Sequence, residues 1–123
     1  MSATILVVED EKSISTLIQY NLEKEGFKVH TSETGEEGFE QIKKNLPDLV
    51  LLDWMLPDLS GIDICKQIKK DPKLKSIPVI MLTAKSEEAD KIRGFETGAD
   101  DYVTKPFSTK ELILRIQESM RSD

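Results

Sequence analysis

The sequence has 123 residues, of which 38% are hydrophobic and 33% charged, and its formal net charge is −6. This length and composition fit one soluble globular domain, and the acidic balance argues against nucleic-acid binding by this chain alone, because such binding needs a basic face. The single cysteine cannot form an internal disulfide, and no apolar run approaches the roughly 18 residues that span a membrane. The N-terminus lacks signal-peptide character. Together these features indicate a cytoplasmic protein without membrane contact.

Five short apolar runs alternate with longer amphipathic stretches along the chain. The first, third and fourth runs are rich in Val, Ile and Leu with little polar alternation, which is typical of strands covered on both faces. The second and fifth are more polar, as expected near the edges of a sheet. The five predicted strands are Thr4–Val8, Phe27–Thr31, Leu49–Leu52, Ile77–Leu82 and Tyr102–Thr104.

The stretches between these runs have apolar residues at helical spacing and end at glycine or proline. They predict helices over about 12–25, 35–45, 62–70 and 87–97, and a last helix that begins at a Ser108-Thr109 cap and extends to about Met120. The lysines at the end of the third helix, Lys69 and Lys70, are interpreted as solvated. Strands that alternate with helices of this length indicate an α/β fold with right-handed crossovers and a parallel sheet.

Polar side chains follow four of the predicted strands. Glu9 and Asp10 come directly after the first strand, Asp53 ends the third, Thr83 ends the fourth and Lys105 follows the fifth. In open parallel sheets, ligands bind outside the carboxyl ends of the strands. We therefore expect three carboxylates, a hydroxyl and an ammonium to meet at one edge of the sheet.

Three converging carboxylates repel one another unless a cation holds them. Oxygen ligands without His or Cys favour a hard ion, Mg²⁺ or alternatively Mn²⁺. Such an ion leaves room for a phosphoryl oxygen, and Thr83 and Lys105 could bind other oxygens of the same group. Asp53 would be the nucleophile, because carboxylates can form aspartyl phosphates.

Several segments that contain these residues resemble the receiver domain of bacterial two-component response regulators, and the resemblance covers essentially the whole chain. The loop residues Pro57 and Gly61 fit it as well. Residues 54–57 and 98–102 further resemble OmpR/PhoB-type regulators. The matching segments are Ile5–Glu11, Asp48–Asp53, Pro78–Ala84, Gly98–Tyr102 and Lys105–Phe107.

The resemblance implies a flavodoxin-like, doubly wound (βα)5 fold with strand order 2-1-3-4-5, as one domain over residues 1–123 without an output domain in this chain. It implies that Asp10, Asp53 and the backbone carbonyl of Met55 hold Mg²⁺, with Glu9 acting through water. A sensor histidine kinase would phosphorylate Asp53 from its phosphohistidine, and small donors such as acetyl phosphate would also serve. The protein would be a signalling domain rather than an enzyme, catalysing only its own phosphorylation and dephosphorylation.

The resemblance also assigns roles to residues around the phosphoryl site. Thr83 and Tyr102 would be the switch pair, Lys105 would bind the phosphoryl group, and the Lys105–Pro106 bond would be a cis peptide. The switch pair and the cis peptide rest on the family pattern, whereas the binding of phosphoryl oxygens by Lys105 is also expected from its place at the strand ends.

In OmpR/PhoB-type regulators the phosphorylated form pairs through the fourth helix, fifth strand and fifth helix, and controls transcription through an output domain that binds DNA. The resemblance therefore implies a homodimer here, weakened because Gln117 and Ser122 stand where basic residues are usual. The apolar patch would be Ile92, Phe95 and Ile113, and the ion pairs across the dimer would be Lys91 with Glu111, and Asp100 or Asp101 with Arg115.

Two other functions are compatible with a strand-end carboxylate. A haloacid-dehalogenase-type phosphatase also uses an Asp nucleophile, Mg²⁺ and Lys, but usually has a second acidic residue two positions after the nucleophile, where this chain has Met55. A nucleotide- or flavin-binding module would need a Gly- or Ser/Thr-rich loop after the first strand, where Glu9–Glu11 would repel phosphate.

Overall fold

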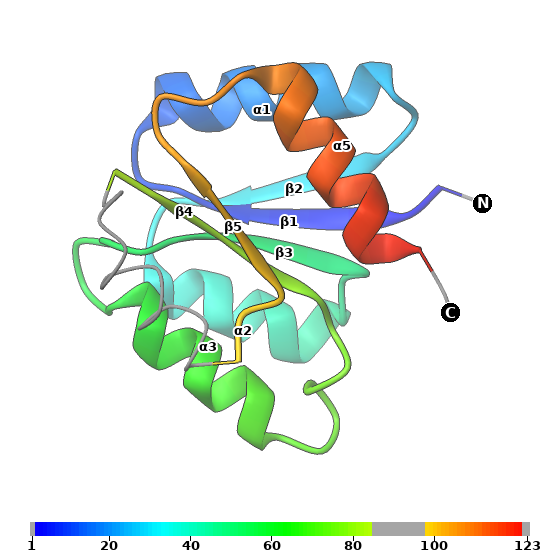
Figure 1. Ribbon diagram of the computed structural model, residues 1–123. Helices are drawn as coiled ribbons and strands as arrows, with labels where there is room; N and C mark the ends of the chain where they lie inside the picture. The colour runs from blue at the N-terminus through cyan, green and yellow to red at the C-terminus, as the bar shows by residue number, and fades with distance from the viewer. Residues whose placement is uncertain (1, 85–97, 122–123) are drawn as a thin grey trace.

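The computed structural model describes residues 2–84 and 98–121, which form a parallel five-stranded sheet in the order β2-β1-β3-β4-β5. Helices α1 and α5 cover one face of this sheet and α2 and α3 cover the other (Figure 1). This is the flavodoxin-like fold and strand order expected from the sequence. The helix expected over 87–97 lies outside the described residues.

The strands begin and end close to the predicted boundaries. Their bounds are β1 Thr4–Val8, β2 Lys28–Ser32, β3 Leu49–Asp53, β4 Val79–Thr83 and β5 Asp101–Thr104. The largest difference is at β4, which begins two residues later than predicted. The N–H of Ile77 donates to the carbonyl of Leu74 at 2.9 Å, so Ile77 belongs to the preceding turn and not to the strand.

The helices follow from their caps and from their apolar faces. Their bounds are α1 Lys12–Lys24, α2 Gly35–Asn45, α3 Gly61–Lys70 and α5 Thr109–Met120. The side chains of Thr34, Ser60 and Ser108 accept hydrogen bonds from the first turns of α2, α3 and α5. Gly26 follows α1 with a φ of 93°, a left-handed conformation that glycine adopts without strain. No helix among the described residues is both long and apolar enough to cross a bilayer.

The hydrophobic core consists of two layers, one on each face of the sheet. Alternate residues of β3 point to opposite faces, so Val50 and Leu52 pack under α2 and α3, while Leu49 and Leu51 pack under α1 and α5. All four are fully buried. Burying an aliphatic side chain of this size contributes about 1.5–3 kcal/mol, so the central strand is a major source of stability and a rigid support for the residue at its end.

Lys69 is not solvated, contrary to the interpretation from the sequence. Its Nζ atom donates to the carbonyl oxygens of Lys75 at 3.2 Å and Ile77 at 2.8 Å, and it forms an ion pair with Asp100 at 3.0 Å. The same carboxylate oxygen of Asp100 accepts the N–H of Val79 at 2.8 Å. Lys69 therefore joins the end of α3 to the starts of β4 and β5.

Candidate functional site

Three carboxylates meet at the carboxyl edge of the sheet, as the sequence predicted. Glu9 and Asp10 follow β1 and Asp53 ends β3, and carboxylate oxygens of the three lie within 4.8 Å of one another. Glu9 is fully buried and Asp53 is 5% exposed, whereas Asp10 is exposed. Two of the three carboxylates are therefore held in the protein interior, and the third faces solvent at the mouth of the site.

Lys105 brings the positive charge that the sequence predicted. Its Nζ atom lies 2.7 Å from Glu9 Oε1 and 3.5 Å from Asp53 Oδ2, so Glu9 is its closer partner. The backbone N–H of Lys105 donates to the carbonyl of Thr83 at 2.7 Å, which fixes the residue beside the end of β4. The Lys105–Pro106 bond is cis, in agreement with the expectation.

The electrostatics of the site are unfavourable for a third negative charge. Burial and the neighbouring Glu9 raise the pKa of Asp53 to about 7, although Lys105 and the N–H of Met55 act in the opposite direction. Burial tends to lower the pKa of Lys105, but its contacts with Glu9 and Asp53 outweigh this effect and raise the pKa. Among the described residues, the ammonium of Lys105 contacts two of the three carboxylates, and a cation at this position would offset the remaining negative charge.

The donor set fits a hard divalent cation. All the available ligands are oxygens, which suits Mg²⁺ or Mn²⁺. The N–H of Met55 donates to Asp53 Oδ1 at 3.1 Å, which places the main chain of Met55 beside the carboxylate. Asp10 and Asp53 therefore lie close enough to share one cation, and the main chain of Met55 lies next to Asp53.

The loop over residues 54–61 is packed tightly against the end of β3. The N–H of Gly61 donates to the carbonyl of Trp54 at 2.9 Å, and Met55 pairs with Ser60 in an isolated antiparallel bridge. A Cβ atom on Gly61 would lie 2.2 Å from the carbonyl oxygen of Asp53. Only glycine allows the first turn of α3 to approach so closely, which explains why the sequence has Gly61 after this loop.

Thr83 and Tyr102, the expected switch pair, lie on neighbouring strands. Thr83 ends β4 and is 1% exposed. It is paired in register with Thr104, and Tyr102 is paired with Met81, so all four side chains are on one face of the sheet. The Tyr102 ring is half-buried against the core layer beneath α2 and α3.

The residues expected to form the dimer face are only partly described. Lys91, Ile92 and Phe95 lie outside the described residues. Ile113 is half-buried against the core layer beneath α1 and α5.

The charged residues of this face form ion pairs within the chain. Arg115 Nη1 lies 2.9 Å from both carboxylate oxygens of Asp101, and Arg115 Nε lies 3.4 Å from Glu111 Oε1. Of the two acidic residues considered as partners of Arg115, Asp101 therefore contacts it within the same chain. Asp100 is engaged by Lys69 instead.

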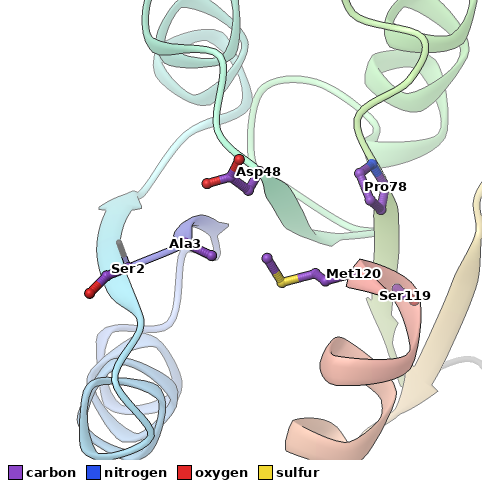
Figure 2. Close-up of a pocket in the computed structure, with 6 residues that line it drawn as sticks. All are labelled: Ser2, Ala3, Asp48, Pro78, Ser119 and Met120. Atoms are coloured by element: carbon purple, nitrogen blue, oxygen red, sulfur yellow. The ribbon is translucent and has the colours of Figure 1, made fainter. Parts of the chain in front are cut away.

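A hollow at the opposite edge of the sheet is not the site. It lies between the start of β3 and the end of α5 (Figure 2), and its one carboxylate, Asp48, accepts the N–H of Thr4 at 2.7 Å. The hollow is lined by Ser2, Ala3, Asp48, Pro78, Ser119 and Met120. This lining brings no group of metal-ligating side chains together, in contrast to the carboxyl edge.

One residue near the site was missed by the sequence analysis. Asp58, in the loop between β3 and α3, accepts hydrogen bonds from the first two N–H groups of α2, those of Gly35 and Glu36. Asp is a favoured helix-capping residue, but Asp58 precedes α3 in sequence and caps a different helix. Capping patterns in the sequence link a residue to the helix that follows it, so they could not identify the contact of Asp58 with α2.

Comparison with known proteins agrees with the fold. The chain matches the response regulator receiver domain family over residues 5–117 and belongs to that family. It is thus a receiver domain of two-component response regulators, a class of signalling domain.

Within that family the chain is similar to PhoB-like regulators. It is 50% identical over 121 residues to the phosphate regulon transcriptional regulatory protein PhoB of Rhizobium meliloti (strain 1021), covering 98% of this chain and 53% of that protein. It is also 50% identical to the alkaline phosphatase synthesis transcriptional regulatory protein PhoP of Bacillus subtilis (strain 168), covering 98% of this chain and 50% of PhoP. The chain therefore spans about half the length of the curated relatives it matches.

Solved structures of response regulators have the same fold as this chain. A putative response regulator from Chloroflexus aurantiacus superposes with a TM-score of 0.93 at 38% identity, covering 98% of both chains. The BeF3-activated receiver domain of DrrB superposes with a TM-score of 0.87 at 39% identity, also covering 98% of both chains.

Proposed function

We propose that this domain accepts a phosphoryl group on Asp53 from the phosphohistidine of a sensor histidine kinase, with Mg²⁺ bound beside it. The observation that carries this proposal is the cluster of Glu9, Asp10 and Asp53 at the carboxyl edge of the sheet, with Lys105 in contact with Glu9 and Asp53. Such a site combines an acceptor carboxylate, a set of ligands for a hard cation and an ammonium that can bind phosphoryl oxygens.

In the transfer, an Asp53 oxygen forms a bond to phosphorus while the phosphorus–nitrogen bond of the phosphohistidine breaks and the imidazole leaves. Asp10, Asp53 and the Met55 carbonyl would hold the metal, with Glu9 acting through water. Bound Mg²⁺ would offset negative charge on the transferring oxygens. Lys105 would then exchange part of its contact with Glu9 for a phosphoryl oxygen, and Thr83 would donate its hydroxyl hydrogen to another.

Phosphorylation would be transmitted by Thr83 and Tyr102 to the face that includes β5 and α5. That face would pair two copies of the chain and so control transcription through a DNA-binding part of a longer protein. The similarity to regulators about twice as long supports this proposal. A phosphatase of the haloacid-dehalogenase type is less favoured, because Met55 offers no carboxylate two residues after Asp53 and the whole chain fits the receiver family.

Intact-mass analysis tests the proposal directly. Incubation with acetyl phosphate or phosphoramidate and Mg²⁺ should add one phosphoryl group, and the addition should disappear with EDTA and in Asp53→Asn. Labelling that persists in that variant would show that Asp53 is not the acceptor.

A further inference from the structure

The first turn of α2 is capped by two residues that come from different parts of the chain. Thr34, which immediately precedes the helix, accepts the N–H of Glu37 at 3.2 Å. Asp58, from the loop between β3 and α3, accepts the N–H of Gly35 at 2.8 Å through Oδ1 and that of Glu36 at 2.9 Å through Oδ2. A local residue usually satisfies these N–H groups, so the use of Asp58 ties a distant loop to the helix.

The charge of Asp58 suits this position. A carboxylate is favoured at a helix N-terminus by the macrodipole and by charge-assisted hydrogen bonds. The N–H groups of Glu36 and Gly35 lower the pKa of Asp58, so its side chain is anionic at neutral pH. The contact is therefore present under the conditions in which the site would bind a cation.

The loop and the first turn of α2 approach each other closely at Gly35. A Cβ atom on Gly35 would lie 2.9 Å from both Leu59 Cβ and Ile64 Cδ1, so glycine is required where the loop meets the first turn of α2. The base of the same loop is fixed by Gly61 against the Asp53 carbonyl. The loop is thus held at its base by β3 and at its tip by α2.

We propose that Asp58 is a positioning residue for the metal and phosphoryl site, because its contact with α2 fixes the loop that carries Met55. The inference rests on the proposed function, in which the Met55 carbonyl is a metal ligand. Asp58 does not itself join the cluster formed by Glu9, Asp10 and Asp53. It acts through the main chain: with its tip held, the loop keeps Met55 beside the Asp53 carboxylate, where the Met55 N–H donates.

The alternative is that Asp58 only stabilises α2, and Thr34→Ala provides a matched control. This variant removes a cap from the same helix end but leaves the loop contacts in place. Both Thr34→Ala and Asp58→Ala should lower the thermal stability. Only Asp58→Ala should change the metal site.

The test measures Mg²⁺ binding to the unphosphorylated protein by the fluorescence of Trp54, the only tryptophan and the neighbour of Asp53. Loss of groups that orient metal ligands usually weakens affinity about 10- to 100-fold, and Asp58 acts from further away, so we expect Asp58→Ala to weaken Mg²⁺ binding about three- to tenfold. Asp58→Asn, with one acceptor oxygen and no charge, should lie between Asp58→Ala and the wild type. Hydrogen exchange over residues 55–61 should become faster in Asp58→Ala and stay unchanged in Thr34→Ala.

An unchanged Mg²⁺ affinity in Asp58→Ala would overturn the inference, and so would an equal loss in Thr34→Ala. Failure of the proposed function would look different. In that case the wild-type protein itself would not bind Mg²⁺, or Asp53→Asn would bind it as tightly as the wild type.

Discussion

Asp53 is an acidic residue in a position that disfavours its charge. Burial and Glu9 raise its pKa from the ordinary value of 3.8 to about 7. Between about pH 4 and pH 7, Asp53 is therefore protonated in the folded protein but ionised in the unfolded chain. The contribution of this group to stability is therefore lost as the pH rises from about 4 to about 7 and does not change further above that range. The residue proposed as the phosphoryl acceptor therefore lowers the stability of the protein at neutral pH when no cation is bound.

It follows that Asp53→Asn should be more stable than the wild type in EDTA at pH 8, by about 1–3 kcal/mol in the free energy of unfolding. At pH 4 the difference should nearly disappear, because Asp53 is then protonated in the folded wild type. Urea unfolding at both pH values measures this, and added Mg²⁺ should narrow the gap at pH 8 by stabilising only the wild type. An Asn variant that is less stable than the wild type at pH 8 would contradict the prediction.

Among the elements, α2 ends where the sequence predicted, but its C-cap residue adopts a backbone conformation that the sequence did not indicate. Its C-cap residue, Leu46, has a φ of 48°, a left-handed conformation that is costly for a side chain with a Cβ atom, and 55% of Leu46 is exposed. Its N–H still donates to the carbonyl of Ile42 at 3.1 Å. The helix ends here because Pro47 follows, and not because the residue suits the conformation.

Leu46→Gly should therefore raise the free energy of unfolding by about 0.5–1 kcal/mol, because relief of the left-handed strain exceeds the added entropy of the unfolded chain. Leu46→Ala is the control, since alanine has the same strain as leucine at this φ and removes only an exposed side chain. Urea denaturation of the three proteins gives the comparison. If Ala stabilises as much as Gly, the backbone conformation is not the cause.

The elements also show what the sequence could and could not predict. Local patterns placed β1 and α2 at their observed bounds, because apolar periodicity and capping residues act over a few residues. The strand-end carboxylates were also predicted, because each directly follows or ends a strand that local patterns identify. A parallel sheet then brings the carboxyl ends of its strands to one edge. The roles of Lys69 and Asp58 were missed because their partners are distant in sequence and only the tertiary structure brings them close.

At the scale of the whole molecule, the proposed function requires phosphorylation of Asp53 to alter a surface that the phosphoryl group does not touch. Thr83→Ala should accept the phosphoryl group normally but lose most of the activated response, because the group can shift the equilibrium only through contacts that differ between the two states. Phosphorylation is followed by intact mass and the response by sedimentation. Thr31→Ala, at an exposed position of β2, is the control. If Thr83→Ala shows the full change in sedimentation, the Thr83 hydroxyl does not couple phosphorylation to the response.

The activated protein should also form a dimer, but a weak one. Beryllofluoride with Mg²⁺ should shift sedimentation toward the dimer as concentration increases, and Ile113→Arg should prevent this by placing a charge in the apolar patch. Exposed ion pairs contribute roughly 0–1 kcal/mol each, so the two pairs lost at Gln117 and Ser122 could weaken association about tenfold. Weak dimers of this kind should form at concentrations on the order of hundreds of micromolar. If the activated protein stays strictly monomeric there, the expectation is wrong.

The ion pairs already formed within the chain have a further consequence for that dimer. Arg115 is bound to Asp101, and Asp100 to Lys69, before any second copy arrives. Pairing Arg115 with an acidic residue across an interface would therefore exchange one partner for another without increasing the number of neutralised charges. Screening by salt affects both sides of such an exchange similarly, so ionic strength should have little influence on these contacts. The choice between monomer and dimer would then depend on the apolar patch and on the state of Asp53.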